Sequence, residues 1–498
     1  MVAGIPPERD PRSPIVVPVE MAEQDLRWSS ISMREVLKRD VLLKAAVFDI
    51  EGRHARETLE ECRWPLTTLA GEHGMAEAFH RPRFKRLWVE KSDLPIHQPG
   101  QIGELNPRPA GYISPLTKTD IEALRVTKGQ ILLTCSGRSG SIGRAAFVSQ
   151  TLDGRIFSHD LIRISCQDSN DSGYMYAFLR TQTGRTLIRS NEYGAMIPHI
   201  EPFHLETVPI PNPPHELKQR IGDLVCHSYA LRDESNALLD EAEQLLIQAL
   251  ELPPLPELHP QYFDRSAEVR NYTVALSTLA GRLDGSYHAP IVGAIVQQLR
   301  AGAAEVTSIG DPRISRRIIL PGRFARVYVG EGQGVPFFGG KGLYDLDPAK
   351  KKYLSLAHHA DRIREQLTLR ENMVLITCSG TIGKVTLVPR HWEKWTANQH
   401  IIRVQPTSRE MAGYIYVFLA TEYGRELIRR FTYGAVVDEI DDRHVAAVPI
   451  PFLKDLAVQR EIGRLALDAN AKRAEAYYVE QSAIRAVNED VIHAKLDG

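Results

Sequence analysis

The chain has little cysteine, and its cysteines form no pattern. There are five in 498 residues, without a CxxC pair: Cys62, Cys135, Cys166, Cys226 and Cys378. An odd, scattered set argues against a disulfide framework and against a zinc site, and it fits a reducing compartment. The adjacent pair His358 and His359 also has no carboxylate or cysteine at ligand spacing. We therefore expect a cytoplasmic protein without a metal site.

Long apolar runs and an excess of one charge are also missing. No run approaches the roughly 18 apolar residues of a membrane span, and the start shows no secretory signal. Lysine and arginine number 61 against 62 acidic residues, a net charge of −1. This balance argues against coating nucleic acid by bulk charge, although a local basic face remains possible. A chain of 498 residues exceeds one ordinary core, so we expect several domains and no membrane partner.

The chain does contain a long internal repeat. Residues 131–137 read ILLTCSG and residues 374–380 read VLITCSG, each an apolar run that predicts a buried strand followed by a glycine-containing turn. Gly383 follows Gly143 by 240 positions. The same separation relates residues 158–160 (SHD) to 398–400 (NQH), the two Tyr-Gly-Ala segments, and the two VPIP segments. This duplication predicts two domains built alike.

Leucine recurs at every seventh position after the first copy: Leu217, Leu224, Leu231, Leu238 and Leu245. Ser228 and Ser235 are polar exceptions at the interleaved positions. The spacing predicts a helix with an a/d seam, about 50 Å long at 1.5 Å per residue. A second helix after the second copy continues the seam, weakened in the middle by Lys472 and Ala476, with Val458, Ile462, Leu465 and Val479. Because isolated helices gain most of their stability from packing, we expect the two to pair antiparallel.

These features divide the chain into six segments and predict an α+β fold. We predict a flexible, proline-rich arm over residues 1–20, a mixed domain over 21–213, a long helix over 214–252, a proline-rich linker over 253–260, a second mixed domain over 261–453, and a second long helix over 454–498.

The repeated SGxxG turn, the block Asn398-Gln399-His400, the Tyr-Gly-Ala segments and the VPIP entry into a long helix resemble the specificity (S) subunits of type I restriction-modification systems, over about residues 25–495. The resemblance implies two target-recognition domains separated by two antiparallel coiled-coil helices. Each domain would read half of a bipartite site on double-stranded DNA, and the helices would set the gap and dock two methyltransferase subunits. A restriction and translocase subunit can join such a phage defence complex. S-adenosylmethionine would then be bound by the adenine-N6 methyltransferase partner, and this chain would bind no cofactor.

The sequence shows no catalytic motif of its own, so we expect no enzyme activity. Residues 212–215 (NPPH) are similar to the catalytic loop of amino-methyltransferases but lack its aromatic residue, and no cofactor loop precedes them. A proline-marked helix start is the alternative. Residues 380–384 lack the spacing of a phosphate loop and its Ser/Thr.

DNA recognition requires cations for phosphates and polar side chains for base edges. The candidate phosphate contacts are Arg81, Arg83, Lys85, Arg138, Arg144, Arg316, Arg317 and Lys384. The candidate base contacts are Ser158, His159, Asn398, Gln399 and His400, and the candidate stacking or phosphate contacts are Tyr193 and Tyr433. The structural alternatives are solvated arginines, hydrogen bonding at a strand end, and aromatic rings buried at a helix end. We predict turn roles, rather than contacts, for Gly137, Gly143, Gly380 and Gly383.

A second function also fits the sequence. The chain could be a duplicated coiled-coil scaffold or regulatory module of a defence complex that binds protein and never contacts DNA. The near-zero net charge favours this alternative slightly, whereas basic loops at equivalent places in both copies favour DNA recognition.

Overall fold

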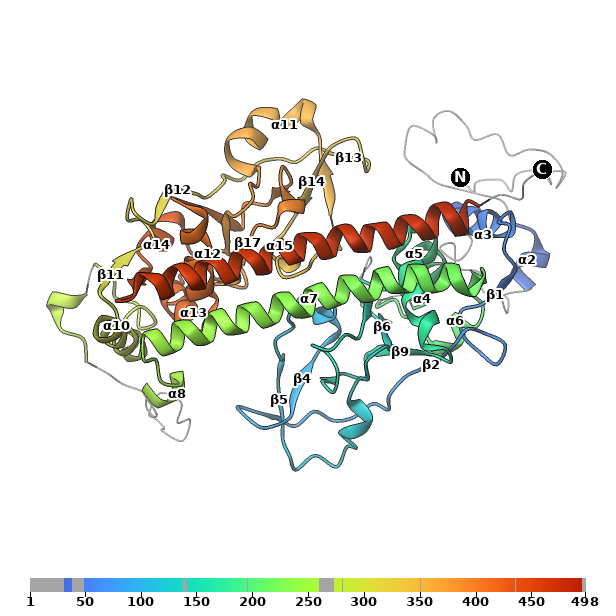
Figure 1. Ribbon diagram of the computed structural model, residues 1–498, viewed down its shortest axis with the longest axis horizontal. Coiled ribbons are helices and arrows are strands. Elements are labelled where there is room, and N and C mark those ends of the chain that lie inside the picture. The colour runs from blue at the N-terminus through green and yellow to red at the C-terminus, as the bar shows by residue number, and fades with distance from the viewer. Residues whose placement is uncertain are drawn as a thin grey trace, which may run out of the picture.

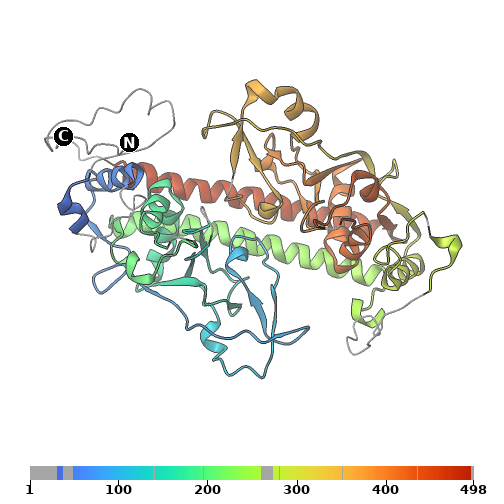
Figure 2. The same cartoon turned by 180° about the vertical axis from the view of Figure 1, so that it is seen from behind.

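Two similar mixed units lie on either side of a pair of long helices (Figures 1 and 2). The computed structural model describes residues 31–37, 49–137, 141–194, 196–258, 273–279, 281–349, 351–434 and 436–494. The predicted arm over 1–20 and the candidate Arg138 lie outside the described residues. The mixed helix and strand content expected from the sequence is confirmed. We call the described residues of 49–213 repeat 1 and those of 281–453 repeat 2.

The two long helices run antiparallel. Helix α7 spans His215–Ala249 and begins directly after two prolines, where a missing backbone N–H costs no helical hydrogen bond. Helix α15 spans Leu456–Ala486 and is capped by the side chain of Asp455, which accepts from the N–H of Ala457 at 2.7 Å. Ion pairs join Arg220 to Asp490 near one end and Glu234 to Lys472 towards the middle, so residue numbers rise along one helix as they fall along the other.

Serine and alanine take six of eight completely buried positions at seven-residue spacing on these helices, and isoleucines take the other two. Eight residues at seven-residue spacing are completely buried: Ile221, Ser228, Ser235 and Ala242 on α7, and Ile462, Ala469, Ala476 and Ala483 on α15. The hydroxyl of Ser228 donates to the carbonyl oxygen of Ala476 at 2.7 Å, across the interface. Small side chains permit this close approach of the two backbones. Ala476 therefore lies in the closest contact and does not weaken the pair.

Of the five leucines predicted for the helix–helix seam, Leu231 clusters with residues of the other helix, and the other four also pack against the cores of the repeats. Leu217 and Leu224 pack against the core of repeat 1, and Leu238 and Leu245 pack against the core of repeat 2. Leu231 lies at the midpoint, in a small cluster with Leu346 of repeat 2, Ala476 and Val479. Helix α15 runs the other way: Val458, Ile462 and Leu465 pack in repeat 2, and Ala483 packs in repeat 1. Val487 and Val491, in the helical turn Val487–Ile492 that follows α15, also pack in repeat 1. Both helices thus contribute to both cores.

Each repeat has the same strand topology. In repeat 1 the sheet orders are β1-β10, β2-β9-β6-β7 and β3-β5-β4-β8, and in repeat 2 they are β11-β20, β12-β19-β16-β17 and β13-β15-β14-β18. The strands of repeat 1 are β1 Leu66–Thr68, β2 Ala76–Phe79, β3 Trp88–Val89, β4 Pro95–His97, β5 Gly111–Ile113, β6 Ile131–Thr134, β7 Ala145–Phe147, β8 Ile156–Phe157, β9 Leu161–Cys166 and β10 Pro209–Pro211. The strands of repeat 2 are β11 Glu305–Ser308, β12 Ser315–Ile319, β13 Tyr328–Val329, β14 Val335–Phe338, β15 Lys352–Leu354, β16 Val374–Thr377, β17 Val385–Leu387, β18 Thr396–Ala397, β19 Ile401–Pro406 and β20 Pro449–Phe452.

The helices of the two repeats also correspond. Helix α3 of repeat 1 and α10 of repeat 2 precede the first strand of their repeat, and the other helices of each repeat named below follow β9 or β19, the longest strand of the four-stranded sheet β2-β9-β6-β7 or β12-β19-β16-β17. Their bounds are α3 Ile50–Glu60, α4 Ser169–Arg180, α5 Gln182–Arg189, α6 Pro202–Leu205, α10 Pro290–Gly302, α12 Arg409–Ala420, α13 Glu422–Arg429 and α14 Asp442–Ala446. Three further short helices are α2 Met33–Leu37, α8 Leu255–Leu258 and α11 Leu356–Arg362. Among the described residues, no helix is both long and apolar enough to cross a membrane.

Glycines bring α4 and α12 into contact with the long helices. A Cβ added at Gly413 of α12 would lie 2.2 Å from the carbonyl oxygen of Gly463 in α15. The equivalent pair in repeat 1 is Gly173 of α4 and Gly222 of α7, where an added Cβ would lie 2.6 Å from a Cα atom. Any side chain at these positions would force α4 of repeat 1 or α12 of repeat 2 away from the helix pair.

We expect Gly413→Ala to lower the free energy of unfolding by about 1–3 kcal/mol, the usual cost of overpacking a buried contact. Gly293→Ala in α10 is the matched control, because nothing lies within 4 Å of the added Cβ. At this exposed helical position alanine should stabilise by up to about 1 kcal/mol. Urea unfolding of both variants measures the difference, and equal effects would contradict the packing described here.

Candidate nucleic-acid interface

Four segments that are far apart in the sequence meet at one end of the main sheet in each repeat. In repeat 2 the N–H of Cys378 donates to the carbonyl oxygen of His400 at 3.0 Å, and the N–H of Gly380 donates to that of Asp438 at 2.9 Å. In repeat 1 the N–H of Gly137 donates to the carbonyl oxygen of Pro198 at 3.3 Å. The SGxxG loop therefore lies between the start of β9 or β19 and the hairpin that begins at the Tyr-Gly dipeptide.

The four predicted turn glycines all have positive φ values, which favour glycine: 140° at Gly137, 78° at Gly143, 76° at Gly380 and 83° at Gly383. Because the hydrogen bonds from Gly137 and Gly380 hold the hairpins, these glycines shape the interface through the backbone.

The fourth segment is a basic loop that leads from the main sheet to the smaller sheet. It reads Arg83-Phe84-Lys85-Arg86 in repeat 1 and Arg323-Phe324-Ala325-Arg326 in repeat 2, again 240 positions apart. Arg86 donates to Ser158 Oγ at 2.8 Å and to Asp160 Oδ2 at 2.7 Å. Arg326 donates to Gln399 Oε1 at 2.6 Å. Sequence reasoning did not place Arg86, Arg323 or Arg326 in the site, although the separation of the repeats could have identified them.

In repeat 1 the block 158–160 is mostly occupied by its own contacts. Ser158 is completely buried, so it orients its neighbours and does not present a contact surface. The ring of His159 lies edge-on to Phe84 at 5.5 Å, and burial lowers the pKa of this histidine. Arg83 and Lys85 are exposed beside it, whereas Arg81 is half-buried over the ring of Phe79 at 4.8 Å. Among the described cations of residues 81–86, Arg83 and Lys85 are therefore the exposed ones.

In repeat 2 the equivalent block is partly accessible. The Asn398 side chain accepts from the N–H of His400 at 3.0 Å, which is the strand-end hydrogen bonding that the sequence left open as an alternative. Gln399 lies between Arg326 and His400, with its Nε2 3.1 Å from the ring nitrogen. The side chain of Arg323 is 81% exposed and approaches Glu439 at only 3.5 Å. Arg323 is thus the cation best placed to meet a ligand here.

The two hairpins carry tyrosines at their bases and apolar residues at their tips. Tyr193 donates to Glu201 Oε1 at 2.8 Å, and Tyr433 is 44% exposed, so a buried aromatic ring does not describe Tyr433. Beyond them, equivalent apolar pairs project outward, with exposed fractions of 94% and 54% for Met196 and Ile197, and 96% and 49% for Val436 and Val437. No sequence motif marks these apolar pairs, and their high exposure in the fold is what singles them out.

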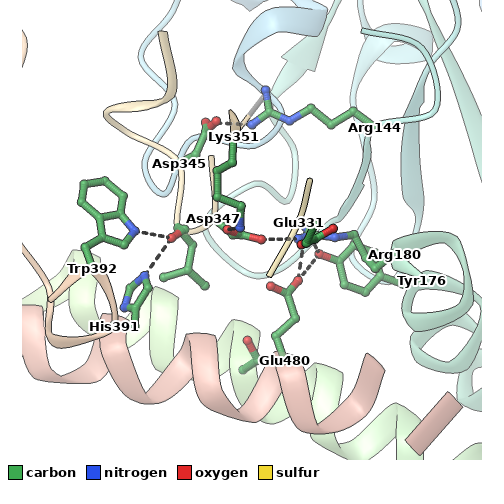
Figure 3. Close-up of polar contacts among 12 residues, drawn as sticks. Arg144, Tyr176, Arg180, Glu331, Asp345, Asp347, Lys351, His391, Trp392 and Glu480 are labelled. Carbon is green, nitrogen blue, oxygen red and sulfur yellow. Dashed lines mark hydrogen bonds and ion pairs between the residues drawn. The ribbon is translucent and has the colours of Figure 1, made fainter. Parts of the chain in front are cut away.

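Arg144 and Lys384 do not lie free in the SGxxG loops. Arg144 Nη2 lies 2.7 Å from Asp345 Oδ1 of repeat 2, and Lys384 Nζ lies 3.5 Å from Glu104 Oε1 of repeat 1. Burial raises the pKa of both carboxyls against the opposing influence of these cations. Glu104 and Asp345 face each other in an antiparallel bridge, so the two ion pairs are related by the internal symmetry (Figure 3 shows the first). Neither cation is therefore free to meet a ligand without breaking its ion pair.

Arg316 and Arg317 also lie away from the interface. Arg316 donates to the carbonyl oxygen of Thr407, which follows strand β19, whereas His400 precedes that strand. At about 3.3 Å per residue, this six-residue strand separates the two ends by roughly 20 Å. Arg316 and Arg317, which the sequence offered as phosphate contacts, therefore lie at the opposite end of this strand from residues 398–400, and their predicted role stays a prediction.

A buried polar network joins both repeats to the helix pair (Figure 3). Glu480 of α15 is 1% exposed and forms ion pairs with Arg232 of α7 at 3.1 Å and with Arg180 of α4 at 3.4 Å. Arg180 also approaches Asp347 of repeat 2 at 3.7 Å. Burial by itself would raise the pKa of Glu480, but the two arginines and a hydrogen bond from Tyr176 outweigh it and lower the pKa to about 2.

This network makes stability depend on pH. Because the folded-state pKa of Glu480 is below its ordinary value of 4.5, its contribution is complete above about pH 4.5 and is lost as the pH falls towards 2. We expect the difference in unfolding free energy between wild type and Glu480→Gln to shrink over this range by up to about 1.4 kcal/mol per pH unit. Urea titrations from about pH 6 downward measure it; a pH-independent difference would mean that the carboxylate is not charged in the fold.

The part of the chain that the structure describes contains no group of three or more His, Cys, Asp or Glu side chains suited to a metal ion. All five cysteines are free thiols. The interface therefore offers cations, amides, imidazoles and exposed backbone, which bind and discriminate ligands.

Comparisons with known proteins give structural neighbours only. No family model matches the sequence, and no curated protein matches it. The type I restriction-modification S subunit from M. genitalium has 12% identity and a TM-score of 0.34, covering 88% of this chain and 97% of that one. The HsdS subunit from Thermoanaerobacter tengcongensis has 16% identity and a TM-score of 0.25, covering 84% and 98%. A chain from a study of type I restriction-modification complex assembly has 15% identity and a TM-score of 0.26, covering 85% and 96%. At these TM-scores the whole chains do not superpose closely, and the comparisons carry no argument about the function of this chain.

Proposed function

We propose that this chain is the non-catalytic DNA-specificity subunit of a type I-like restriction-modification complex. One observation carries the proposal: the same cluster of basic loop, polar strand start and Tyr-Gly hairpin occurs twice, on two units fixed to one helix pair. A duplicated binding surface on a rigid connection suits a ligand with two separated recognition elements. A bipartite site on double-stranded DNA is such a ligand.

The side chains of each cluster match the two requirements of DNA recognition. Arg83 and Lys85 in repeat 1, and Arg323 in repeat 2, are exposed cations for phosphates. Gln399 and His400 in repeat 2 can donate to or accept from base edges, whereas His159 in repeat 1 would first have to leave Asp160, which lies 3.2 Å from its Nε2. Because the two clusters differ in these polar residues, we infer that the two half-sites have different sequences.

The helix pair would set the distance between half-sites and dock the catalytic partners. Each helix is anchored in both cores, so the separation of the repeats is fixed by helix length. We infer that two methyltransferase subunits, which carry S-adenosylmethionine and modify adenine at N6, bind around this frame in the cytoplasm. A restriction subunit can join them.

The contribution of Arg323 can be isolated by a salt series. Arg323→Ala should weaken specific DNA binding by about 1 kcal/mol and reduce the slope of log K against log salt by about one, because one phosphate contact is lost. Arg316→Ala is the matched control from the same repeat and should leave both quantities unchanged. Gel-shift titrations with the methyltransferase bound provide the measurement. Equal losses in the two variants would place the DNA surface elsewhere.

A protein-binding scaffold that never contacts DNA is the second candidate. The exposed apolar pairs at the hairpin tips favour it, because apolar surface of this kind commonly marks a protein interface. Methylome sequencing of a host with and without this chain separates the two candidates. The specificity subunit predicts a bipartite methylated motif that disappears with the chain, whereas a scaffold predicts an unchanged motif.

A further inference from the structure

A cavity of about 240 Å³ lies where the two repeats meet the helix pair. Its walls come from helix α5 and residues 142–146 of repeat 1, from residues 346–349 of repeat 2, and from α7 and α15. The volume equals several water molecules of about 30 Å³ each, enough for a phosphate or diphosphate group. Polar contacts at its edge include Arg144 with Asp345, and Arg180 with Glu480 (Figure 3).

Guanidinium groups dominate the lining of this cavity. The lining arginines are Arg144, Arg180, Arg185, Arg189 and Arg232, against the two carboxylates of Asp347 and Glu480. Arg144 is engaged by Asp345, and Arg180 and Arg232 share Glu480. Arg189 Nε donates to Glu192 Oε1 at 3.4 Å and forms an ion pair with it. Within the described residues, the guanidinium of Arg185 has no hydrogen bond or ion pair.

Helix α5 presents one polar face to the cavity. Gln182, Arg185, Thr186 and Arg189 follow the three- and four-residue spacing of one helical face, and all four line the cavity. The side chain of Gln182 donates to Thr186 Oγ1 at 3.4 Å, so both can turn to another acceptor. Burial, followed by the charge of Arg180, lowers the pKa of Arg185 to about 10, and the nearby carboxylates of Asp347 and Glu480 offset this only in part.

The equivalent face in repeat 2, on helix α13, carries no net charge. Helix α13 carries Glu422 and Glu426 where α5 has Gln182 and Thr186, beside Arg425 and Arg429. Glu426 lies 3.6 Å from Arg429, so this helix supplies its own counter-charges. A cavity of about 100 Å³ at the corresponding place has Tyr344, Leu239 and Arg473 in place of Gly103, Glu480 and Arg232, and no residue of α13 lines it. Of the four arginines on these two faces, Arg185 alone has a guanidinium without a hydrogen bond or ion pair to the described residues.

We propose that this cavity binds a phosphate dianion or another phosphoryl group, held by Arg185 and Arg189 with Gln182 and Thr186 as neutral donors. Arginine guanidinium groups bind phosphate oxygens through paired charge-assisted hydrogen bonds. The ligand would contact walls from both repeats, so it would stabilise the arrangement of the two units about the helices. Its source is a free phosphoryl compound or a backbone phosphate of nucleic acid.

Binding is tested on the full chain by isothermal titration with sodium phosphate and sodium pyrophosphate at constant ionic strength set by chloride. Wild type should bind, and its thermal midpoint should rise with phosphate, because a ligand that prefers the folded state stabilises it. Gln182→Glu with Thr186→Glu, which installs the residues of repeat 2, should weaken binding about tenfold or more, since it supplies the missing counter-charges. Arg185→Gln should do the same.

Arg425→Gln is the matched control on α13 and should leave phosphate binding unchanged. Circular dichroism without phosphate verifies that each variant is folded, and the double glutamate variant is expected to be at least as stable as wild type. Competition by a non-specific duplex identifies nucleic-acid backbone as the source, and its absence identifies a free phosphoryl compound. The proposal is overturned if wild type binds neither phosphate nor pyrophosphate, or if Arg425→Gln weakens binding as much as Arg185→Gln.

Discussion

The structure depends on each long helix being shared between two hydrophobic cores. Helix α7 starts in the core of repeat 1 and ends in that of repeat 2, and α15 returns in the opposite direction. Neither helix would be stable alone in water, and neither core would be closed without both helices. The contact between them is made by buried serine and alanine, which bring the backbones close enough for Ser228 to bond Ala476. The two repeats therefore take up their positions relative to each other when their cores fold.

Buried charge adds a second constraint on that position. Glu480 is surrounded by arginines from α4 and α7, and Asp347 of repeat 2 extends the network across the molecule. A buried carboxylate without partners would be expensive, so the two repeats cannot separate at this junction without a large cost. The reciprocal ion pairs of Arg144 and Lys384 act in the same way. A bipartite ligand would thus meet two surfaces at a fixed distance.

The two repeats share a frame and differ where specificity would lie. The arginine of the basic loop orients Ser158 and Asp160 in one repeat and Gln399 in the other. The same divergence distinguishes helix α5, with Gln182 and Thr186, from helix α13, which has glutamates at the equivalent positions. Duplication therefore supplies the geometry twice, and substitution at a few side chains gives each copy its own chemistry.

The sequence by itself determined the repeat, the turn glycines and the existence of two long helices, because these depend on local periodicity and on backbone conformations that neighbouring residues specify. It could not determine what each helix face contacts. The leucines at Leu224 and Leu238 follow the correct spacing but pack into different cores, whereas Ser228 and Ser235, which look like interruptions, form the contact between helices. It also could not separate free cations from engaged ones: Arg144 and Arg323 look alike in sequence, yet one is bound to Asp345 and the other is 81% exposed. Only the tertiary structure decided these points, because burial and ion pairing depend on residues that are distant in the chain.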